Sequence, residues 1–258
     1  MAKLRNISNF DYPLLMADGR LKGIDDYHIF GRNTQTPTSF EHICENGIYR
    51  TPQISGATKL RVKAGNAADT VAGVGARSIR LRGIDIAGDE IDEIIDTAGT
   101  SASANTVNTF LRLHDVDVYA SGSYENSHAG TIIIEDAAGS EDWAEIDIDD
   151  LAFAKAHIGS FVIPKGKRGF IDYILMTTDT DKTADFIFYF NADITQTAPP
   201  YKAHEVIQLY DGVEHYTEFR PKAPSGPFPP MSEITAYSRG STGTTKTSVE
   251  IEITLIDE

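Results

Sequence analysis

The chain has almost no cysteine, because Cys44 is the single one among 258 residues. One thiol cannot form an internal disulfide, so the fold does not depend on such a cross-link. The residues around Cys44 carry no signature of a catalytic thiol, and we interpret it as a buried, unreactive side chain.

Long apolar runs and an excess of positive charge are also missing. No run approaches the roughly 20 apolar residues that a membrane helix needs. The opening segment MAKLRNISNFDYPLLMADG lacks the apolar core and cleavage site of a secretory signal. The chain has 23 Lys and Arg against 38 Asp and Glu, a net charge of -15, which opposes binding to phosphates. We therefore expect neither a membrane nor a nucleic acid as a partner.

Apolar and polar residues alternate in many short runs from Leu60 onward, which is the period of a β-strand. The clearest run covers residues 249–255, where every second side chain is apolar. Turn-forming clusters such as PKGKRG, TDTDKTAD and APSGPFPP separate the runs. The segment DDLAFAKAHI, residues 149–158, fits either a helix or another strand.

This pattern predicts an all-β protein of antiparallel β-sandwich or jelly-roll-like modules. We place two modules in tandem, at residues 57–158 and 159–258. Residues 1–56 show little periodicity and are interrupted by glycine and proline, so they are predicted to form an extended N-terminal arm. The arm contains too many apolar side chains for a free tail, so we expect another surface to cover it.

The stretch DTVAGVGARSIRLRGID contains Gly73, Gly75 and Ser78 in a G-x-G-x-x-S frame, close to that of a phosphate-binding loop. Such a loop needs a helix after it, whose N-terminus faces the phosphates. Here the following residues alternate as in a strand. We interpret the glycines as part of a loop that feeds a strand and needs positive φ angles.

The acidic clusters are interpreted as structural. Asp179, Asp181 and Asp185 lack the glycine and closing glutamate of a calcium loop, which favours a solvated turn. Glu145, Asp147 and Asp149 share one face of a strand, and we interpret that face as exposed to solvent.

Catalytic signatures are absent as well. Asp85 and Glu93 resemble a glycosidase pair only as any two acids of a β protein would. The seven histidines show no H-x-x-x-H spacing, and no G-x-S-x-G elbow occurs. We therefore expect no enzyme activity, no cofactor, no metal and no catalytic residue.

Two long stretches resemble a family of tailed-bacteriophage virion proteins from environmental and marine phages. They are LRVKAGNAADTVAGVGARSIRLRGIDIAGDEIDEIIDTAGT and NTFLRLHDVDVYASGSYENSHAGTIII. Downstream, FVIPKGKRGFIDY and PFPPMSEITAYS resemble the same family, so the resemblance covers about residues 55–258. The matching positions in the first two stretches are Ala68, Asp69, Thr70, Gly73, Gly75, Ala76, Arg77, Gly83, Asp85, Phe110, Leu111, Arg112, Asn126 and Gly130.

The resemblance implies a structural role in the virus particle, without an activity or cofactor. The leading hypothesis is a capsid decoration, or cement, protein that bridges neighbouring coat subunits. Its expected partners are the major capsid protein, other virion proteins and copies of itself, with a trimer favoured. It would be made in the host cytoplasm and reside in the virion. A tail or neck component (an adaptor or fibre base) and a carbohydrate- or host-receptor-binding module are the alternatives; Trp143, Tyr201 and Phe228 are the aromatics to inspect for the latter.

The candidate interface residues fall into two groups. Apolar side chains of the arm are expected to contact the capsid or a neighbouring subunit. Three arginines are expected to pair with the acids of GDEIDEIID or to meet a neighbouring subunit. They are Phe10, Leu14, Leu15, Ile29, Phe30 and Phe40 from the arm, and the arginines Arg77, Arg80 and Arg82.

Overall fold

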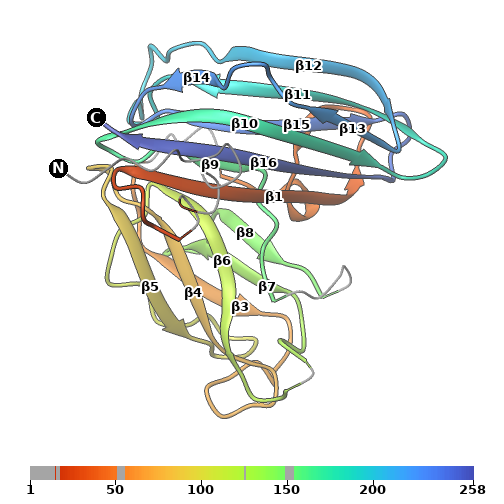
Figure 1. The fold of residues 1–258 in the computed structure, drawn as a ribbon. Coiled ribbons are helices and arrows are strands. Elements are labelled where there is room, and N and C mark those ends of the chain that lie inside the picture. The colour runs from red at the N-terminus through yellow and green to blue at the C-terminus, as the bar shows by residue number, and fades with distance from the viewer. Residues whose placement is uncertain (1–14, 16–17, 51–55, 125, 149–153) are drawn as a thin grey trace.

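A computed structural model describes residues 15, 18–50, 56–124, 126–148 and 154–258 of the protein. These residues form antiparallel β-sheets with one short 3-10 turn (Figure 1), which confirms the predicted all-β class. No helix among them has the length and apolar character to cross a membrane. The elements are β1 (Ile24–Thr36), β2 (Glu41–His42), η1 (Glu45–Gly47), β3 (Leu60–Ala64), β4 (Ala76–Ile84), β5 (Glu90–Asp96), β6 (Arg112–Ser121), β7 (Ile132–Asp136), β8 (Asp142–Ile146), β9 (Ser160–Val162), β10 (Lys167–Thr178), β11 (Thr183–Asn191), β12 (Glu205–Glu214), β13 (Tyr216–Phe219), β14 (Ser225–Phe228), β15 (Glu233–Gly240) and β16 (Thr245–Asp257).

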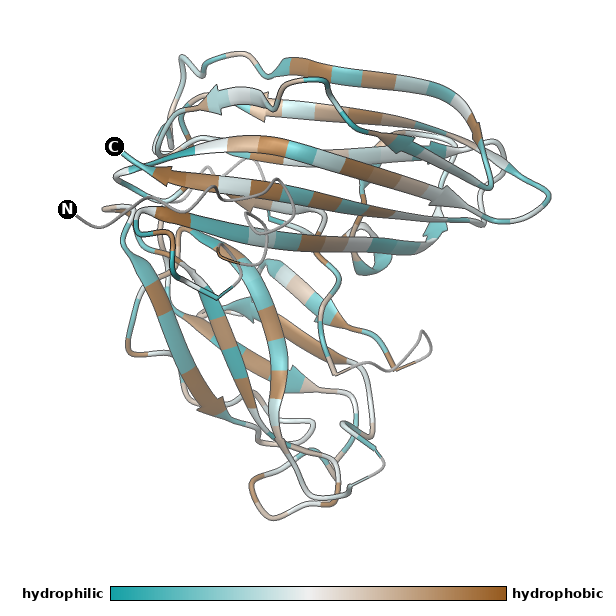
Figure 2. Ribbon diagram, in the orientation of Figure 1, coloured by the Kyte–Doolittle hydropathy of each residue, from teal (hydrophilic) through white to brown (hydrophobic). Residues whose placement is uncertain are grey.

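The larger part of the molecule, here called the large module, is a β-sandwich. One sheet has the order β1-β16-β10-β13, with β14 also paired to β10, and the other has the order β12-β11-β15-β2, with β9 paired to β15. Apolar side chains of both sheets meet between them, and the brown bands of Figure 2 mark the alternation along each strand. Val249, Ile251 and Ile253 of β16 are completely buried, as their spacing predicts.

A small module is built from two three-stranded sheets, with the orders β3-β7-β8 and β5-β4-β6. Its core contains Leu60 and Ile132 from the first sheet and Leu81 and Val116 from the second. The backbone of residues 154–156 continues the second sheet beside β6, through bonds from Val118 N to Ala154 O and from Ala156 N to Val116 O. Residues 154–158 therefore form no helix, and 155–158 follow the left-handed residue Ala154, while 149–153 lie outside the described residues.

The two modules do not follow one another along the chain as predicted. β1 pairs with β16 along most of its length, from Ile24 opposite Ile256 to Thr36 opposite Thr245. β2 likewise pairs with β15. The small module is therefore inserted between β2 and β9, and residues 24–36 are a strand of the large module rather than a separate arm.

The sequence analysis did not predict β1, because the inward positions of this strand are not uniformly apolar. Ile29, Gly31 and Asn33 are all buried. A Cβ on Gly31 would lie 2.4 Å from the Cα of Gly159, so only glycine fits there. Asn33 is accommodated because its Nδ2 donates to Glu41 Oε1 at 2.6 Å. Two of three inward residues thus break the apolar alternation on which the sequence analysis relies.

A buried ion pair joins the two modules. Arg112, the first residue of β6, donates from Nε to Glu233 Oε1 of β15 at 3.0 Å, and both side chains are buried. Tyr49 donates its hydroxyl to the same oxygen at 2.8 Å. Apolar contacts surround this point, and a small cluster that includes Leu111 and Val162 packs across the junction. The pair therefore sets how the small module projects from the sandwich.

Replacing Arg112 by Met should destabilise the protein by about 3–5 kcal/mol, because it removes the cation that compensates a buried carboxylate. Urea unfolding at neutral pH measures this change. The matched control is Arg80→Met, which removes a partly exposed pair with Asp92 and should cost much less than Arg112→Met. If both variants lost the same free energy of unfolding, the conclusion that Arg112 compensates a buried carboxylate would be contradicted.

Candidate binding surface at the distal loops

Three loops lie together at the end of the small module that points away from the sandwich (Figure 1). We call residues 65–75, 97–102 and 122–131 the distal loops; residue 125 lies outside the described residues. The strand registers bring them to one end, because Ala64 at the end of β3 is opposite Ile132 at the start of β7. Ala76 at the start of β4 is likewise opposite Ser121 at the end of β6.

The carboxylate of Asp69 holds these loops together from inside. Asp69 is completely buried, and its Oδ1 accepts hydrogen bonds from the backbone N–H groups of Ala76 and Ala129, both at 2.8 Å. Its Oδ2 accepts from Gly130 N at 3.0 Å. The backbone oxygen of Asp69 accepts from Gly99 N at 2.7 Å. One residue therefore contacts all three distal loops, and its buried charge is compensated by three donors.

The glycines of the G-x-G-x-x-S frame serve close packing around this carboxylate. A Cβ on Gly73 would lie 1.9 Å from the carbonyl oxygen of Ala68, and a Cβ on Gly75 would lie 2.1 Å from Asp69 Oδ1. Neither glycine has a positive φ, so the predicted conformational reason is wrong and the steric one replaces it. The prediction of a loop that feeds a strand is confirmed, because β4 begins directly after Gly75.

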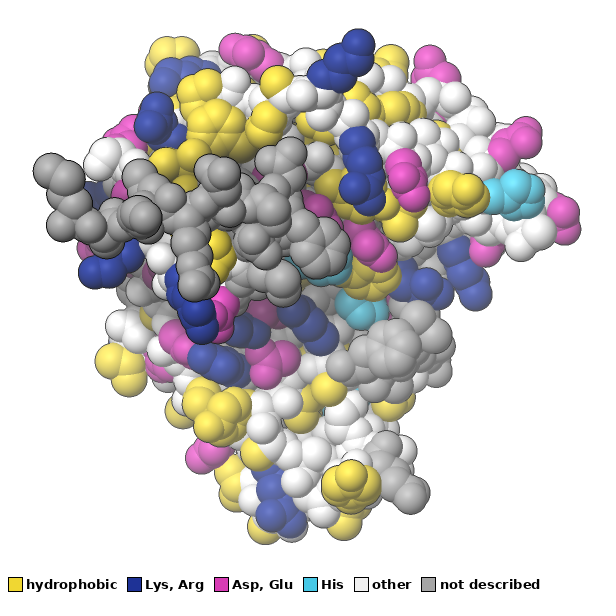
Figure 3. All heavy atoms as spheres, viewed as in Figure 1, with side chains coloured by type: hydrophobic (Ala, Val, Ile, Leu, Met, Phe, Trp, Pro, Cys, Tyr) yellow, Lys and Arg dark blue, Asp and Glu magenta, His cyan; other side chains and the backbone are white. Residues whose placement is uncertain are grey.

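Exposed apolar side chains project from this fixed framework. Val71 is 55% exposed, Val74 is 66% exposed and Tyr124 is fully exposed. The distal loops contain only two charged residues, Asp69 and Glu125, and no Lys or Arg, although 24% of the chain is charged. In Figure 3 the lower end of the molecule is mostly yellow and white with some dark blue Lys or Arg atoms, and most magenta and dark blue side chains lie nearer to β1. Apolar residues on loops that a scaffold holds in place are typical of a binding surface.

The sequence analysis did not single out Val71, Val74 or Tyr124. Val71 and Val74 lie in one short segment and Tyr124 in another, both made mostly of small, uncharged residues. Such segments are typical of ordinary turns. The usable signal was the shared lack of Lys and Arg in three segments that each follow a strand. That signal becomes informative only when the three segments are known to meet.

The predicted interface residues of the arm occupy different environments. Phe10 and Leu14 lie outside the described residues. Ile29 is buried in the sandwich core, and Leu15, Phe30 and Phe40 are half-buried. Phe30 contacts the ring of His157, with 5.0 Å between the ring centroids, and the guanidinium of Arg239 covers Phe40 at 4.7 Å. Ile29 thus serves the internal core of the subunit.

The three predicted arginines differ in their partners. Arg80 donates to Asp92 of β5, with 2.8 Å between Nε and Oδ1, as predicted. Arg82 instead pairs with Asp115 and Asp117 of β6, which lies on the other side of β4. Arg77 is exposed, and its Nε donates to the carbonyl oxygen of Gly73 at 2.9 Å. Of the three, only Arg77 borders the distal loops.

A cleft of about 310 Å³ lies between β1 and the β5-β4-β6 sheet. Tyr27, Phe30 and Phe161 line its apolar side, while Arg82, His114, Asp115 and Lys155 supply polar groups. Burial lowers the pKa of His114 to about 3, and the charge of nearby Arg112 adds to this shift. Lys155 pairs with Asp115 at 2.9 Å. The ionised groups of the cleft therefore pair mainly with one another.

The other acids that the sequence analysis considered act as hydrogen-bond acceptors in turns and strands. Asp85 accepts from Ala87 N and Asp89 N of its own turn, and Glu93 accepts from Val107 N and from Asn108. Asp179 accepts from Lys246 N, and Asp185 accepts from Gly212 N and Arg239. Within the described residues, no cluster of three metal-binding side chains occurs.

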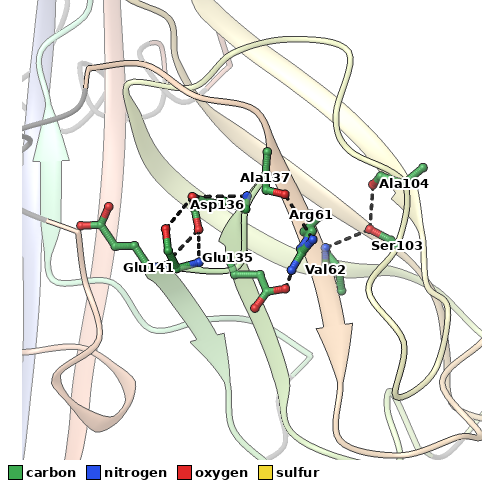
Figure 4. Close-up of polar contacts among 10 residues, drawn as sticks. Arg61, Val62, Ser103, Ala104, Glu135, Asp136, Ala137 and Glu141 are labelled. Carbon is green, nitrogen blue, oxygen red and sulfur yellow. Dashed lines mark hydrogen bonds and ion pairs between the residues drawn. The ribbon is translucent and has the colours of Figure 1, made fainter.

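The carboxylates of Glu135 and Asp136, drawn in Figure 4, also act as hydrogen-bond acceptors. Arg61 of β3 donates from Nε to Glu135 Oε1 of β7 at 2.6 Å, and Asp136 accepts from Ser140 N and Glu141 N at the following turn (Figure 4). Here too the carboxylates fix strand pairing and turn conformation.

The aromatics considered for a sugar platform are largely hidden. Trp143 and Phe228 are buried, and Tyr201 is 44% exposed. Trp143 lies under the guanidinium of Arg50, at 4.4 Å from the ring centroid. Two of the three aromatics therefore contribute to the interior of the molecule.

The interpretation of Glu145, Asp147 and Asp149 as a solvent-exposed face of a strand is wrong for Glu145. Its side chain is almost completely buried and accepts a hydrogen bond from Asn46 Nδ2 at 2.6 Å. Burial raises the pKa of Glu145 to about 7, and the bond from Asn46 opposes part of the shift. The sequence pattern missed this because η1, from the segment before the small module, covers the polar face of β8. Asp149 lies outside the described residues.

No family model and no curated protein matches the chain. Among solved structures, the VP2 subviral particle of infectious bursal disease virus aligns over 92% of this chain and 73% of that chain, at 10% identity and a TM-score of 0.23. The T13 particle of the same virus aligns over 91% and 69%, at 9% identity and a TM-score of 0.22. TM-scores this low establish neither a common fold nor a common function. The resemblance to phage virion proteins stays a prediction.

Asp69→Asn should destabilise the protein by at least about 2 kcal/mol, because an amide cannot accept all three backbone bonds and leaves a buried N–H without a partner. The amides of Ala129 and Gly130 should also exchange faster with deuterium. Asp85→Asn is the matched control, because Asp85 also accepts two backbone bonds, but in an exposed turn. It should cost less than about 1 kcal/mol. A similar small cost for Asp69→Asn would show that its carboxylate does not organise the loops.

The stability of the protein should carry a pH dependence from Glu145. Its folded pKa of about 7 lies above the usual glutamate pKa of 4.5, so the folded state binds this proton more tightly than the unfolded chain does. The contribution is favourable below about pH 4.5 and is lost as the pH rises to about 7, up to about 3 kcal/mol. Glu145→Gln should remove this dependence and stabilise the protein most at pH 8. Urea unfolding curves at several pH values measure this dependence. If the stability of the wild type and of Glu145→Gln changed equally with pH, the role of Glu145 would be contradicted.

Proposed function

We propose that the chain is a structural protein of a virus particle and that it acts by binding neighbouring proteins. The observation that carries this proposal is the distal loop surface, where Val71, Val74 and Tyr124 are exposed on loops that contain few charged residues and that Asp69 holds together from inside. The resemblance of residues 55–258 to tailed-phage virion proteins supports the same role. The finer proposal is a capsid decoration protein.

The architecture suits a protein that bridges subunits of a shell. The large module offers a broad, stable base, and the buried pair of Arg112 and Glu233 holds the small module at a fixed angle to it. A partner bound at the distal loops is then connected rigidly to whatever the large module contacts. Each such bridge must break before the bridged subunits separate, so the contacts add to the resistance of the shell.

The net charge of -15 favours specific over indiscriminate contacts. Like-charged surfaces repel, which keeps such a protein soluble and limits random association. Apolar burial at the uncharged distal loops contributes roughly 25 cal/mol per Å² without the desolvation of ionised groups. Binding is therefore favoured at this surface over the acidic remainder of the molecule.

The copy number of the chain in purified virions should be of the same order as that of the major capsid protein. Quantitative mass spectrometry with isotope-labelled peptides of both proteins measures this ratio. The tail proteins of the same particles serve as internal controls for low copy number.

Each outcome of this measurement is decisive for part of the proposal. A ratio near that of the tail proteins would overturn the decoration role and favour a tail or neck component. Absence from purified particles would overturn the structural role altogether.

A further inference from the structure

We infer that the distal loops bind a second copy of this chain, end to end. The inference rests on the proposed function only for the assignment of this surface as a binding surface. Val71, Val74 and Tyr124 form the centre of the contact, and the matching surface of the second copy supplies the same side chains. A contact in which both partners use the same surface is self-complementary and closes into a symmetric oligomer.

Charge favours a second copy at this end of the molecule. Two copies with a net charge of -15 each repel when carboxylate-bearing surfaces approach. At the distal loops the carboxylate of Asp69 is buried and accepts three backbone hydrogen bonds, which leaves Glu125 as the remaining acid. A basic partner would gain more by binding the acidic faces elsewhere.

The exposed apolar residues of β12 are less suited to such a contact. Val206 and Leu209 are also exposed, but they lie on β12 together with Glu205, Asp211 and Glu214, and β12 contains no Lys or Arg. Two copies that met through β12 would bring these acids together. Copies of the chain therefore meet at lower electrostatic cost through the distal loops.

The distal loops are also prepared for binding before a partner arrives. Asp69 connects them, and the backbone packs so closely that a Cβ on Gly122 would lie 2.0 Å from the carbonyl oxygen of Gly73. Ordering a flexible loop on binding costs free energy, and a braced loop avoids most of this cost. The exposed valines have few rotamers to lose, which lowers the cost further.

The test compares two double variants by analytical ultracentrifugation over a range of protein concentrations. Val71→Asp with Val74→Asp places carboxylates at the proposed contact. Val206→Asp with Leu209→Asp is the matched control, because Val206 is 55% exposed, as Val71 is. All four positions are exposed, and circular dichroism and urea unfolding verify that both variants keep the fold. Tyr124→Asp provides a further single variant at the contact.

The wild-type chain should form a dimer, and the distal double variant should weaken this association at least about tenfold. The control variant should associate like the wild type. Because the contact contains almost no ionised groups, association should be unchanged or stronger when sodium chloride is raised from about 0.05 to 0.5 M.

Three results would overturn the inference: a wild-type chain that stays monomeric, equal weakening by both double variants, or association that high salt abolishes. These results leave the proposed function separately testable. If the chain is monomeric in solution but abundant in virions, only the inference of a second copy as partner is overturned. If the chain is absent from virions, the proposed function itself is overturned.

Discussion

The placement of the two modules depends on one buried carboxylate, that of Glu233. It accepts hydrogen bonds from Arg112 of the small module and from Tyr49 of the segment that leads into it. A buried charge is tolerated only when its partners are held in good geometry. Because these partners come from different parts of the chain, the requirement couples the small module to the sandwich. Together with the apolar cluster at the junction, this coupling gives the distal loops their position relative to the base of the molecule.

The same use of carboxylates recurs through the molecule. Asp69 organises the distal loops, Asp85 and Glu93 fix local loop conformation, and Asp185 bonds to β12 and to Arg239 of β15. These acids contribute order, since they accept hydrogen bonds from backbone N–H groups and from side chains. The hydrogen bonds of these carboxylates give an acidic protein an ordered framework. Because the carboxylate of Asp69 is buried, it adds no charge to the surface of the distal loops, where apolar side chains are exposed.

Local pattern was enough to predict the fold class but not its topology. The strands from Leu60 onward alternate clearly because each has one face in a core, and β16 is the clearest of them. β1 escaped prediction because Gly31 and Asn33 occupy inward positions, and its partner β16 lies more than two hundred residues further along the chain. Nothing local to either strand encodes such a pairing. The distal surface was missed for a related reason, since the loops that contain Val71 and Tyr124 are brought to one end only through the strand registers. Likewise, the need for glycine at position 75 follows from the place of the Asp69 carboxylate, which sequence spacing does not reveal.

The central claim is that this chain works through its distal loops, and a cryo-electron microscopy map of purified virions tests it most directly. The account predicts that the loops around Val71, Val74 and Tyr124 are enclosed by protein density, with a second copy of the chain against them. A map in which these loops face solvent, while the acidic faces of the sandwich make all contacts, would contradict it.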